Sequence, residues 1–418
     1  MPQDLVLIFA YHFPPENVIG AVRPYRFYKY LLRLGYRCHV ITAADVAQRP
    51  DLDAERVSDP FVDQPRIGVG WQIERAIRKF LMPGVAGSQW SVHAYRAALR
   101  FIDKNPGYRV TLFSTFPPMG VHFAAYWLAR QRQLPWIADY RDPVGDNPIH
   151  SNINRFTQDV YRKLERIFVR ANDVAIANTD AAQTKLKRDY PNRAGRIELI
   201  WNGFDPEERL VALPPAFSDR KVLAHVGELY GGRDASPILR SLRRLIDQQR
   251  IHPGEILVHL AGPAVAGSVP DAAFMEMAAA EGWLRLDSDR VPQQTAHLII
   301  QTANYLLLIQ PQTALQVPGK LFEYLQIGRP ILALVPPDSP VERILAKSGV
   351  PYLCVYPSAS DREFDNLIFE FLQLSTHEVK PSQWFEDEFN AEHHAGKVAQ
   401  LVQQVQAQVL NRALASAK

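Results

Sequence analysis

The chain has 418 residues, enough for two or more domains that each bury their own core. With 47% hydrophobic and 22% charged residues it has the composition of an ordinary globular protein. Its two cysteines, Cys38 and Cys354, exclude a disulfide framework or a cysteine metal cluster, and both lie in apolar runs typical of buried thiols in a reducing compartment.

The first residues and the hydropathy indicate a cytoplasmic protein. Residues 1–10 lack a basic segment and lead directly into an apolar strand pattern. No apolar run approaches the roughly 18 residues that a transmembrane helix needs. We therefore expect a cytoplasmic protein without a membrane span, with peripheral attachment to the inner face of the plasma membrane as a further hypothesis.

The net charge of +3 is divided unevenly along the chain. Residues 1–200 hold 28 Lys and Arg against 19 Asp and Glu, a balance of +9, and the remainder holds 19 against 25, a balance of −6. A basic half indicates an anionic partner, such as a membrane surface, a phosphorylated acceptor or nucleic acid. Uneven surface charge without a partner is the alternative.

The first half alternates apolar runs with segments of helical spacing, which is typical of a parallel sheet with crossover helices. Strands are predicted at residues 5–10, 37–42, 110–114, 135–139, 174–177 and 196–201. Helices are predicted at residues 20–34, 71–81, 90–103, 119–132, 155–170 and 180–189. Residues 44–66 are polar and rich in Asp, Arg and Pro, so a surface loop is expected there.

The same rhythm restarts after the turn signals at 202–206 and 213–215. Strands are predicted at residues 221–227, 255–261, 283–286, 305–309, 330–335 and 352–355. Helices are predicted at residues 235–249, 271–281, 294–302 and 341–346, between Gly319 and Gly328, and at 360–374 and 386–414.

These elements predict an α/β protein with two doubly wound, Rossmann-like domains that face a cleft. The expected boundaries are 1–205 for the N-terminal domain and 206–378 for the C-terminal domain. A helical tail, 379–418, is expected to return to the N-terminal domain. Ligands of such sheets bind at the carboxyl ends of the strands.

One segment, 317–336, combines a Pro-Gly turn, a short helix, the closing Gly328 and an apolar strand. Lys320 lies in the first turn of this helix, where the helix dipole disfavours a cation unless an anion is bound. Glu323 follows one turn later on the same face and is placed to accept hydroxyl groups. A solvated Lys–Glu pair explains the same spacing.

Residues 71–81 place Ile73, Ile77 and Phe80 on one side of a helix and basic residues on the other. Such a segment suits an anionic bilayer, so Trp71 to Leu81 is a candidate membrane contact. A core-packed helix with a solvated basic face explains the pattern equally.

Several known motifs are absent or arise by chance. The Asp-x-Asp triplets at Asp51 and Asp287 match a metal-binding pattern that is common by chance. The chain has no Gly-x-Gly-x-x-Gly, P-loop or His-Glu-x-x-His pattern, which argues against dinucleotide redox enzymes, P-loop ATPases and zinc hydrolases.

Eight short motifs, in this order and spacing, resemble the retaining glycosyltransferases of GT-B fold, family 4 type, over nearly the whole chain. The motifs are Tyr11–Glu16, Gly20–Arg23, Ser114–Pro118, Ala138–Asp142, Trp201–Asp205, Val226–Arg233, Leu260–Pro263 and Val317–Pro336. The resemblance implies a metal-independent hexosyltransferase that needs no cofactor. It implies transfer from a nucleoside-diphosphate sugar to a saccharide or lipid-linked acceptor, with retention, in surface polysaccharide or glycolipid synthesis; no nucleic acid partner is expected.

The resemblance also assigns the donor site. It implies that Lys320 and Arg233 hold the diphosphate and that Glu323 binds the ribose hydroxyls. Two fixed cations can stabilise the charge that develops on the leaving diphosphate. Gly20 and Gly232 permit close approach of the backbone to phosphate.

Candidate acceptor-side groups lie in the first half. Arg23 is a candidate contact for acceptor or phosphate, with surface pairing to Glu16 as the alternative. His12 is a candidate general base, with a turn-capping histidine as the alternative. Asp139, Arg141 and Asp142 at a strand end either orient an acceptor hydroxyl, with Asp142 as a catalytic candidate, or form an internal Arg–carboxylate lattice.

The chain departs from the resembled pattern at three places. Leu315 stands where relatives carry the first of two glutamates, residues 114–118 contain no histidine, and the usual second cation after Arg233 is missing. A sugar-nucleotide epimerase on the same fold and a non-catalytic nucleotide-sugar-binding protein are therefore the alternative functions.

Overall fold

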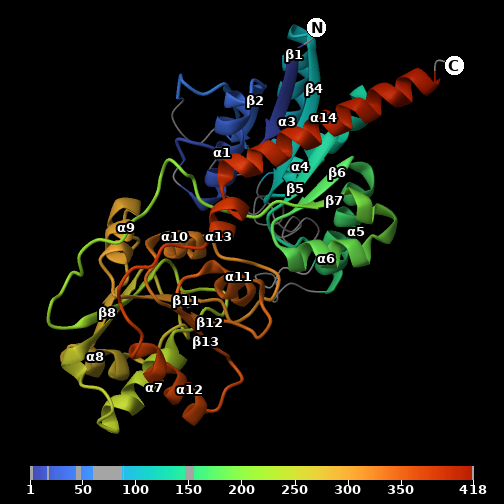
Figure 1. Cartoon of the computed structure of the whole chain (residues 1–418). Helices are drawn as coiled ribbons and strands as arrows, with labels where there is room; N and C mark the ends of the chain where they lie inside the picture. Colours follow the sequence, from blue (N-terminus) through green and yellow to red (C-terminus); the bar gives the residue numbers. More distant parts are fainter. Residues whose placement is uncertain are drawn as a thin grey trace, which may run out of the picture. The chain divides into compact units, whose positions relative to one another are not determined.

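The two runs of alternating strands and helices form two separate parallel sheets in the computed structural model (Figure 1). The structure describes residues 3–16, 18–43, 49–59, 87, 89–145 and 155–416. One compact unit contains residues 1–202 and 391–418, and the other contains residues 203–390. The expected helix 71–81, with its membrane hypothesis, lies outside the described residues.

The sheet of the first unit has seven strands, all paired in parallel. Its strands, in spatial order, are β3 (Ala54–Val57), β2 (Arg37–Ala43), β1 (Gln3–Phe9), β4 (Tyr108–Phe116), β5 (Trp136–Tyr140), β6 (Val174–Ala177) and β7 (Ile197–Leu199). The order reverses between β1 and β4, as in a doubly wound sheet.

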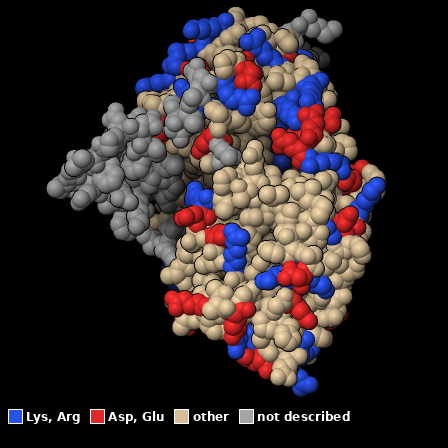
Figure 2. Space-filling view, turned by 90° about the vertical axis from the view of Figure 1, so that its left-hand side faces the viewer, with Lys and Arg blue, Asp and Glu red and all other residues tan. Residues whose placement is uncertain are grey.

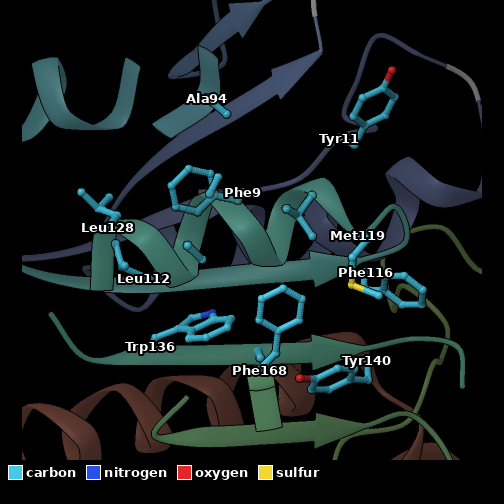
Figure 3. Close-up of a cluster of buried hydrophobic side chains, with 14 of the residues drawn as sticks. Phe9, Tyr11, Ala94, Leu112, Phe116, Met119, Leu128, Trp136, Tyr140 and Phe168 are labelled. Atoms are coloured by element: carbon cyan, nitrogen blue, oxygen red, sulfur yellow. The ribbon is translucent and has the colours of Figure 1, made fainter. Parts of the chain in front are cut away.

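Helices cover both faces of this sheet. They are α1 (Ile19–Arg33), α3 (Trp90–Lys104), α4 (Gly120–Arg132), α5 (Arg155–Ala171), α6 (Asp180–Asp189) and α14 (Ala391–Ser416). Because side chains alternate along a strand, β1 serves two cores. Val6 and Ile8 pack with α1 and α14, whereas Leu7 and Phe9 pack with α3 and α4. Figure 3 shows the second core, where the fully buried Trp136 lies beside Phe168.

The sheet of the second unit has six parallel strands. In spatial order they are β10 (Leu284–Asp287), β9 (Ile256–Ala261), β8 (Lys221–Val226), β11 (Tyr305–Ile309), β12 (Ile331–Leu334) and β13 (Tyr352–Val355). Its helices are α7 (Ser236–Asp247), α8 (Ala272–Ala280), α9 (Gln293–Gln301), α10 (Lys320–Ile327), α11 (Pro340–Ser348), α12 (Asp361–Leu372) and α13 (Gln383–Glu388). The expected fold class, two Rossmann-like domains of GT-B type, is confirmed.

Gly328 ends α10 as the sequence predicts. Its φ is +72°, and a Cβ there would lie 2.1 Å from the carbonyl oxygen of Val379. The position therefore needs glycine for its backbone conformation and for the close approach of Val379.

Two expectations about secondary structure are wrong. Residues 44–66 were expected to form only loop, yet β3 lies within them; an edge strand pairs on one side only, so it can be short and polar. The expected single helix 386–414 is divided between α13 and α14. The chain turns there because the Phe389 carbonyl accepts from the Phe204 amide at 2.9 Å, and residues 379–390 stay with the second unit.

On the face drawn in Figure 2, basic and acidic side chains are interspersed. Among the described residues, no helix is long and apolar enough to cross a membrane.

Candidate functional site

The candidate donor site lies at the carboxyl edge of the second sheet. Parallel strands end at the same edge, so the loops after β8 and β11 come together there. The loop after β8 carries Gly232 and Arg233, and the loop after β11 leads into α10, which begins at Lys320. The structure thus brings together candidate donor residues that the sequence places about 90 positions apart.

Lys320 is tied to the end of β8. Its Nζ donates to the carbonyl oxygen of Val226 at 2.7 Å and lies 3.3 Å from Nε2 of His225. A Cβ at Gly227, whose φ is +117°, would lie 3.0 Å from this Nζ, so glycine keeps the approach open. Burial, and secondarily Arg233, lower the pKa of Lys320 to about 7, although Glu323 opposes the shift.

The Arg233 guanidinium contacts two neighbours of the second unit, Gln310 and Tyr230. Its Nε donates to Oε1 of Gln310 at 3.0 Å, and the group lies over the Tyr230 ring at 4.7 Å from the centroid. Asp234, the next residue in the chain, accepts from the amide of Ser236 at 2.8 Å.

Gly232 fits a space that a larger residue cannot enter. Its φ is +83°, and a Cβ there would lie 1.8 Å from the side-chain amide of Gln312. The glycine therefore lets the loop after β8 approach the loop after β11.

Glu323 and Lys320 take different partners. Glu323 Oε1 lies 3.8 Å from Nε2 of His297 on α9, and this carboxylate is the main cause that raises the pKa of His297. The Glu323 side chain is 37% exposed, which leaves it accessible to a hydroxyl ligand. Leu315 lies in the loop before α10, where an aliphatic side chain offers no hydrogen bond to a sugar.

His225 is a site residue that the sequence analysis missed. It is fully buried on β8, and its Nδ1 lies 3.0 Å from the carbonyl oxygen of Leu307 on β11. Burial, together with Lys320, lowers its pKa well below the ordinary value, so the ring is neutral. The available signal was a polar residue inside an apolar strand, which needs a partner when it is buried.

In the first unit, Arg23 pairs with Asp139 and not with Glu16. The Arg23 Nε and Nη2 donate to the two carboxylate oxygens at 3.0 and 2.8 Å, and Asp139 also accepts from Thr115 at 2.8 Å. Arg23 further donates to the carbonyl oxygens of Ile200 and Trp201. The pair therefore joins α1, β5 and the segment after β7, as an internal lattice does.

Arg141 is likewise used within the first unit. It donates to the carbonyl oxygens of Phe116, Pro117 and Gly20 at 2.9, 2.9 and 2.6 Å. Burial lowers its pKa. Asp142 follows it in the turn after β5 and lines a small hollow with Lys185.

His12 forms a pair with Glu16. Its Nδ1 lies 2.8 and 2.9 Å from the two carboxylate oxygens. The ring edge lies 3.1 Å from the position of a Cβ on Gly20, so that glycine makes room for the imidazole. The His12 side chain is 34% exposed. A carboxylate on one ring nitrogen fixes the orientation of the imidazole, an arrangement that proton-transfer groups share.

The two Asp-x-Asp triplets are engaged in local pairs. Asp51 pairs with Arg49, and Asp287 pairs with His259 and Arg285. The described residues contain no group of three potential metal ligands.

The sequence model of glycosyltransferase family 4 matches residues 20–208. No curated protein matches the sequence. Many solved structures are similar to this chain, and the following three are examples that cover nearly all of both chains. Sucrose-phosphate synthase from Thermosynechococcus elongatus has a TM-score of 0.65 at 14% identity, with coverage of 97% of this chain and 100% of that one. The Anabaena HepE protein in complex with UDP and glucose has a TM-score of 0.55 at 14% identity, and the match covers 99% of this chain and 100% of that one. A trehalose-phosphate synthase from Burkholderia vietnamiensis has a TM-score of 0.59 at 12% identity, and the match covers 98% of this chain and 100% of that one. At these identities the likeness establishes the fold.

Proposed function

We propose that this chain, whose residues 20–208 match the model of glycosyltransferase family 4 and whose fold is that of GT-B enzymes, transfers a hexosyl group with retention of configuration. The donor is a nucleoside-diphosphate sugar and the acceptor is a saccharide or lipid-linked saccharide. The reaction belongs to surface polysaccharide or glycolipid synthesis, and it needs no metal or further cofactor.

The position of Lys320 carries this proposal. Transfer breaks the bond between the anomeric carbon and a phosphate oxygen, which leaves a nucleoside diphosphate with additional negative charge. Lys320 at the first residue of α10 and Arg233 on the glycine-containing loop provide two cations at one sheet edge. The amino end of α10 adds its dipole to the same field.

A uridine nucleotide is the first donor to test. The Anabaena HepE protein, similar in fold, was solved with UDP and with UDP-glucose. In this chain we propose that Glu323 receives the ribose hydroxyls, because its carboxylate is accessible one turn after Lys320.

The donor site is tested by thermal shift with UDP-, GDP- and ADP-sugars. We expect one nucleotide class to raise the Tm of the wild type, and Lys320→Ala, Arg233→Ala and Glu323→Ala to reduce or remove the shift. Arg240→Ala is the control, since it removes a cation from the exposed face of α7. Full binding in both Lys320→Ala and Glu323→Ala would refute the site.

Inversion of configuration is the second candidate outcome, and the His12–Glu16 pair favours it. An inverting transferase needs a base for the acceptor hydroxyl, whereas in retention the leaving phosphate can take that proton. NMR of the first-formed anomer distinguishes the two. If the product keeps the anomeric configuration of the donor and His12→Asn turns over as fast as the wild type, His12 is not the base.

The alternative functions are separated by product analysis. An epimerase releases a free epimer, a transferase produces a glycosylated acceptor, and a non-catalytic binder gives neither product nor donor hydrolysis.

The proposed lipid-linked acceptor is tested by flotation with anionic vesicles, because residues 1–200 carry a balance of +9. Absence of flotation at low salt would remove the membrane part of the proposal.

A further inference from the structure

His225 connects three elements of the second unit through one imidazole ring. It lies on β8, its Nδ1 contacts the Leu307 carbonyl of β11, and its Nε2 faces Lys320 at the start of α10. A buried imidazole is favourable only when its ring nitrogens have partners. Both nitrogens of His225 have one.

The contact with Leu307 fixes the tautomer. A carbonyl oxygen can only accept, so Nδ1 carries the hydrogen and donates it. The lone pair of the neutral ring is then on Nε2, directed at the Lys320 ammonium 3.3 Å away. Tyr324 of α10 donates to the same Leu307 oxygen at 3.4 Å, which further fixes that carbonyl.

We propose that His225 is a positioning residue of the diphosphate site, which aims the Lys320 ammonium at the phosphate oxygens. The inference rests on the donor role of Lys320 proposed above. It assigns to a buried strand residue, 95 positions from Lys320, a function in donor binding.

The chemistry of the two partners explains why a neutral acceptor suits this place. An ammonium has three hydrogens, and Val226 and His225 accept two, which leaves the third for a ligand oxygen. A carboxylate in the place of His225 would form an ion pair with Lys320 and compete with phosphate for its charge. An imidazole lone pair fixes the direction of the flexible lysine and leaves the positive charge available.

Three variants test the inference. His225→Phe keeps an aromatic ring without donor or acceptor, and His225→Gln restores an amide oxygen that can accept from Lys320. His259→Phe is the matched control, since it removes a buried imidazole from the adjacent strand β9, where the ring pairs with Asp287. The folded state of each is checked by circular dichroism and Tm.

The first readout is the affinity for the nucleotide sugar that shifts the wild-type Tm. Loss of a hydrogen bond to a charged group corresponds to a weakening of about 10- to 100-fold, which we expect in His225→Phe. His225→Gln should recover most of this loss, and His259→Phe should bind as the wild type does.

The second readout needs no donor. Competitive acetylation with trace acetic anhydride, followed by mass spectrometry across pH, reports the reactivity and titration of Lys320. We expect a titration near pH 7 in the wild type, a displaced one in His225→Phe and a return in His225→Gln. Unchanged titration and donor affinity in His225→Phe would overturn the inference while leaving the donor site intact. A wild type that binds no nucleotide sugar would overturn the proposed function and, with it, this inference.

Discussion

Arg23 of α1 and Asp139 of β5 form a buried bidentate ion pair, with N–O distances of 3.0 and 2.8 Å. Asp139 is completely buried, and Arg23 is 7% exposed. Arg23 also donates to the carbonyl oxygens of Ile200 and Trp201, so the pair connects α1 and β5 to the segment after β7. Loss of one partner of such a buried pair destabilises a protein more than loss of one partner of an exposed pair, because the remaining charge stays buried without its counterion.

Breaking this pair should strongly destabilise the first unit. Arg23→Ala leaves the Asp139 carboxylate buried without its cation, so we expect a loss of about 3 to 5 kcal/mol in the free energy of unfolding. Urea denaturation followed by tryptophan fluorescence measures it. Arg109→Ala, which breaks the exposed pair with Asp4, should lose less than about 1 kcal/mol. Equal losses in the two variants would show that the buried Arg23–Asp139 pair stabilises the first unit no more than the exposed pair does.

Donor binding should weaken as the pH rises above about 7. The free Lys320 has its pKa lowered to about 7, and a bound diphosphate favours the ammonium, so binding takes up a proton near neutral pH. Below pH 7 the lysine is already charged and the effect vanishes. Calorimetry in two buffers of different ionisation enthalpy measures the proton uptake. Lys320→Arg, whose guanidinium stays protonated, should show none; equal uptake in that variant would assign the proton to another group.

Substitution of Gly232 should impair donor binding more than substitution of its neighbour. Gly232→Ala brings a Cβ into the side chain of Gln312, in addition to the strain of a φ of +83°. Gly231→Ala carries a similar strain, with a φ of +58°, but meets nothing within 4 Å. Each should lose about 1 to 2 kcal/mol from backbone strain. We expect the donor-dependent Tm shift to fall only in Gly232→Ala; equal effects would indicate that strain alone matters.

The first unit should be sensitive to acid because of His122. This fully buried histidine shares a hydrogen bond with the Ser114 hydroxyl, whose oxygen lies 2.8 Å from Nδ1 of His122. Burial lowers the pKa of His122 to about 3. The unfolded chain therefore takes up a proton near pH 6.5 that the folded chain takes up only near pH 3. Stability from the neutral ring is complete above pH 6.5 and falls as the pH drops, by about 3 kcal/mol at pH 4. In His122→Phe, denaturation curves should show a smaller loss between pH 6.5 and 4; an equal loss would place the acid sensitivity elsewhere.

The sequence by itself determined most of the framework. Apolar runs and helical spacing indicated the strands and helices of both sheets, because burial on two faces requires continuous apolar strands. The Pro-Gly turn, Lys320 and Gly328 located α10 after β11, since those signals act within a few residues.

Only the tertiary structure decided which side chains meet. Arg23 and Asp139 are 116 residues apart, and Lys320 and His225 are 95 apart, so strand order and register bring them together. Local spacing suggested Glu16 for Arg23 and Glu323 for Lys320, but burial selected partners from neighbouring strands, and Glu16 paired with His12. Buried polar groups must find a partner wherever the fold places one, and that requirement leaves no local pattern in the sequence.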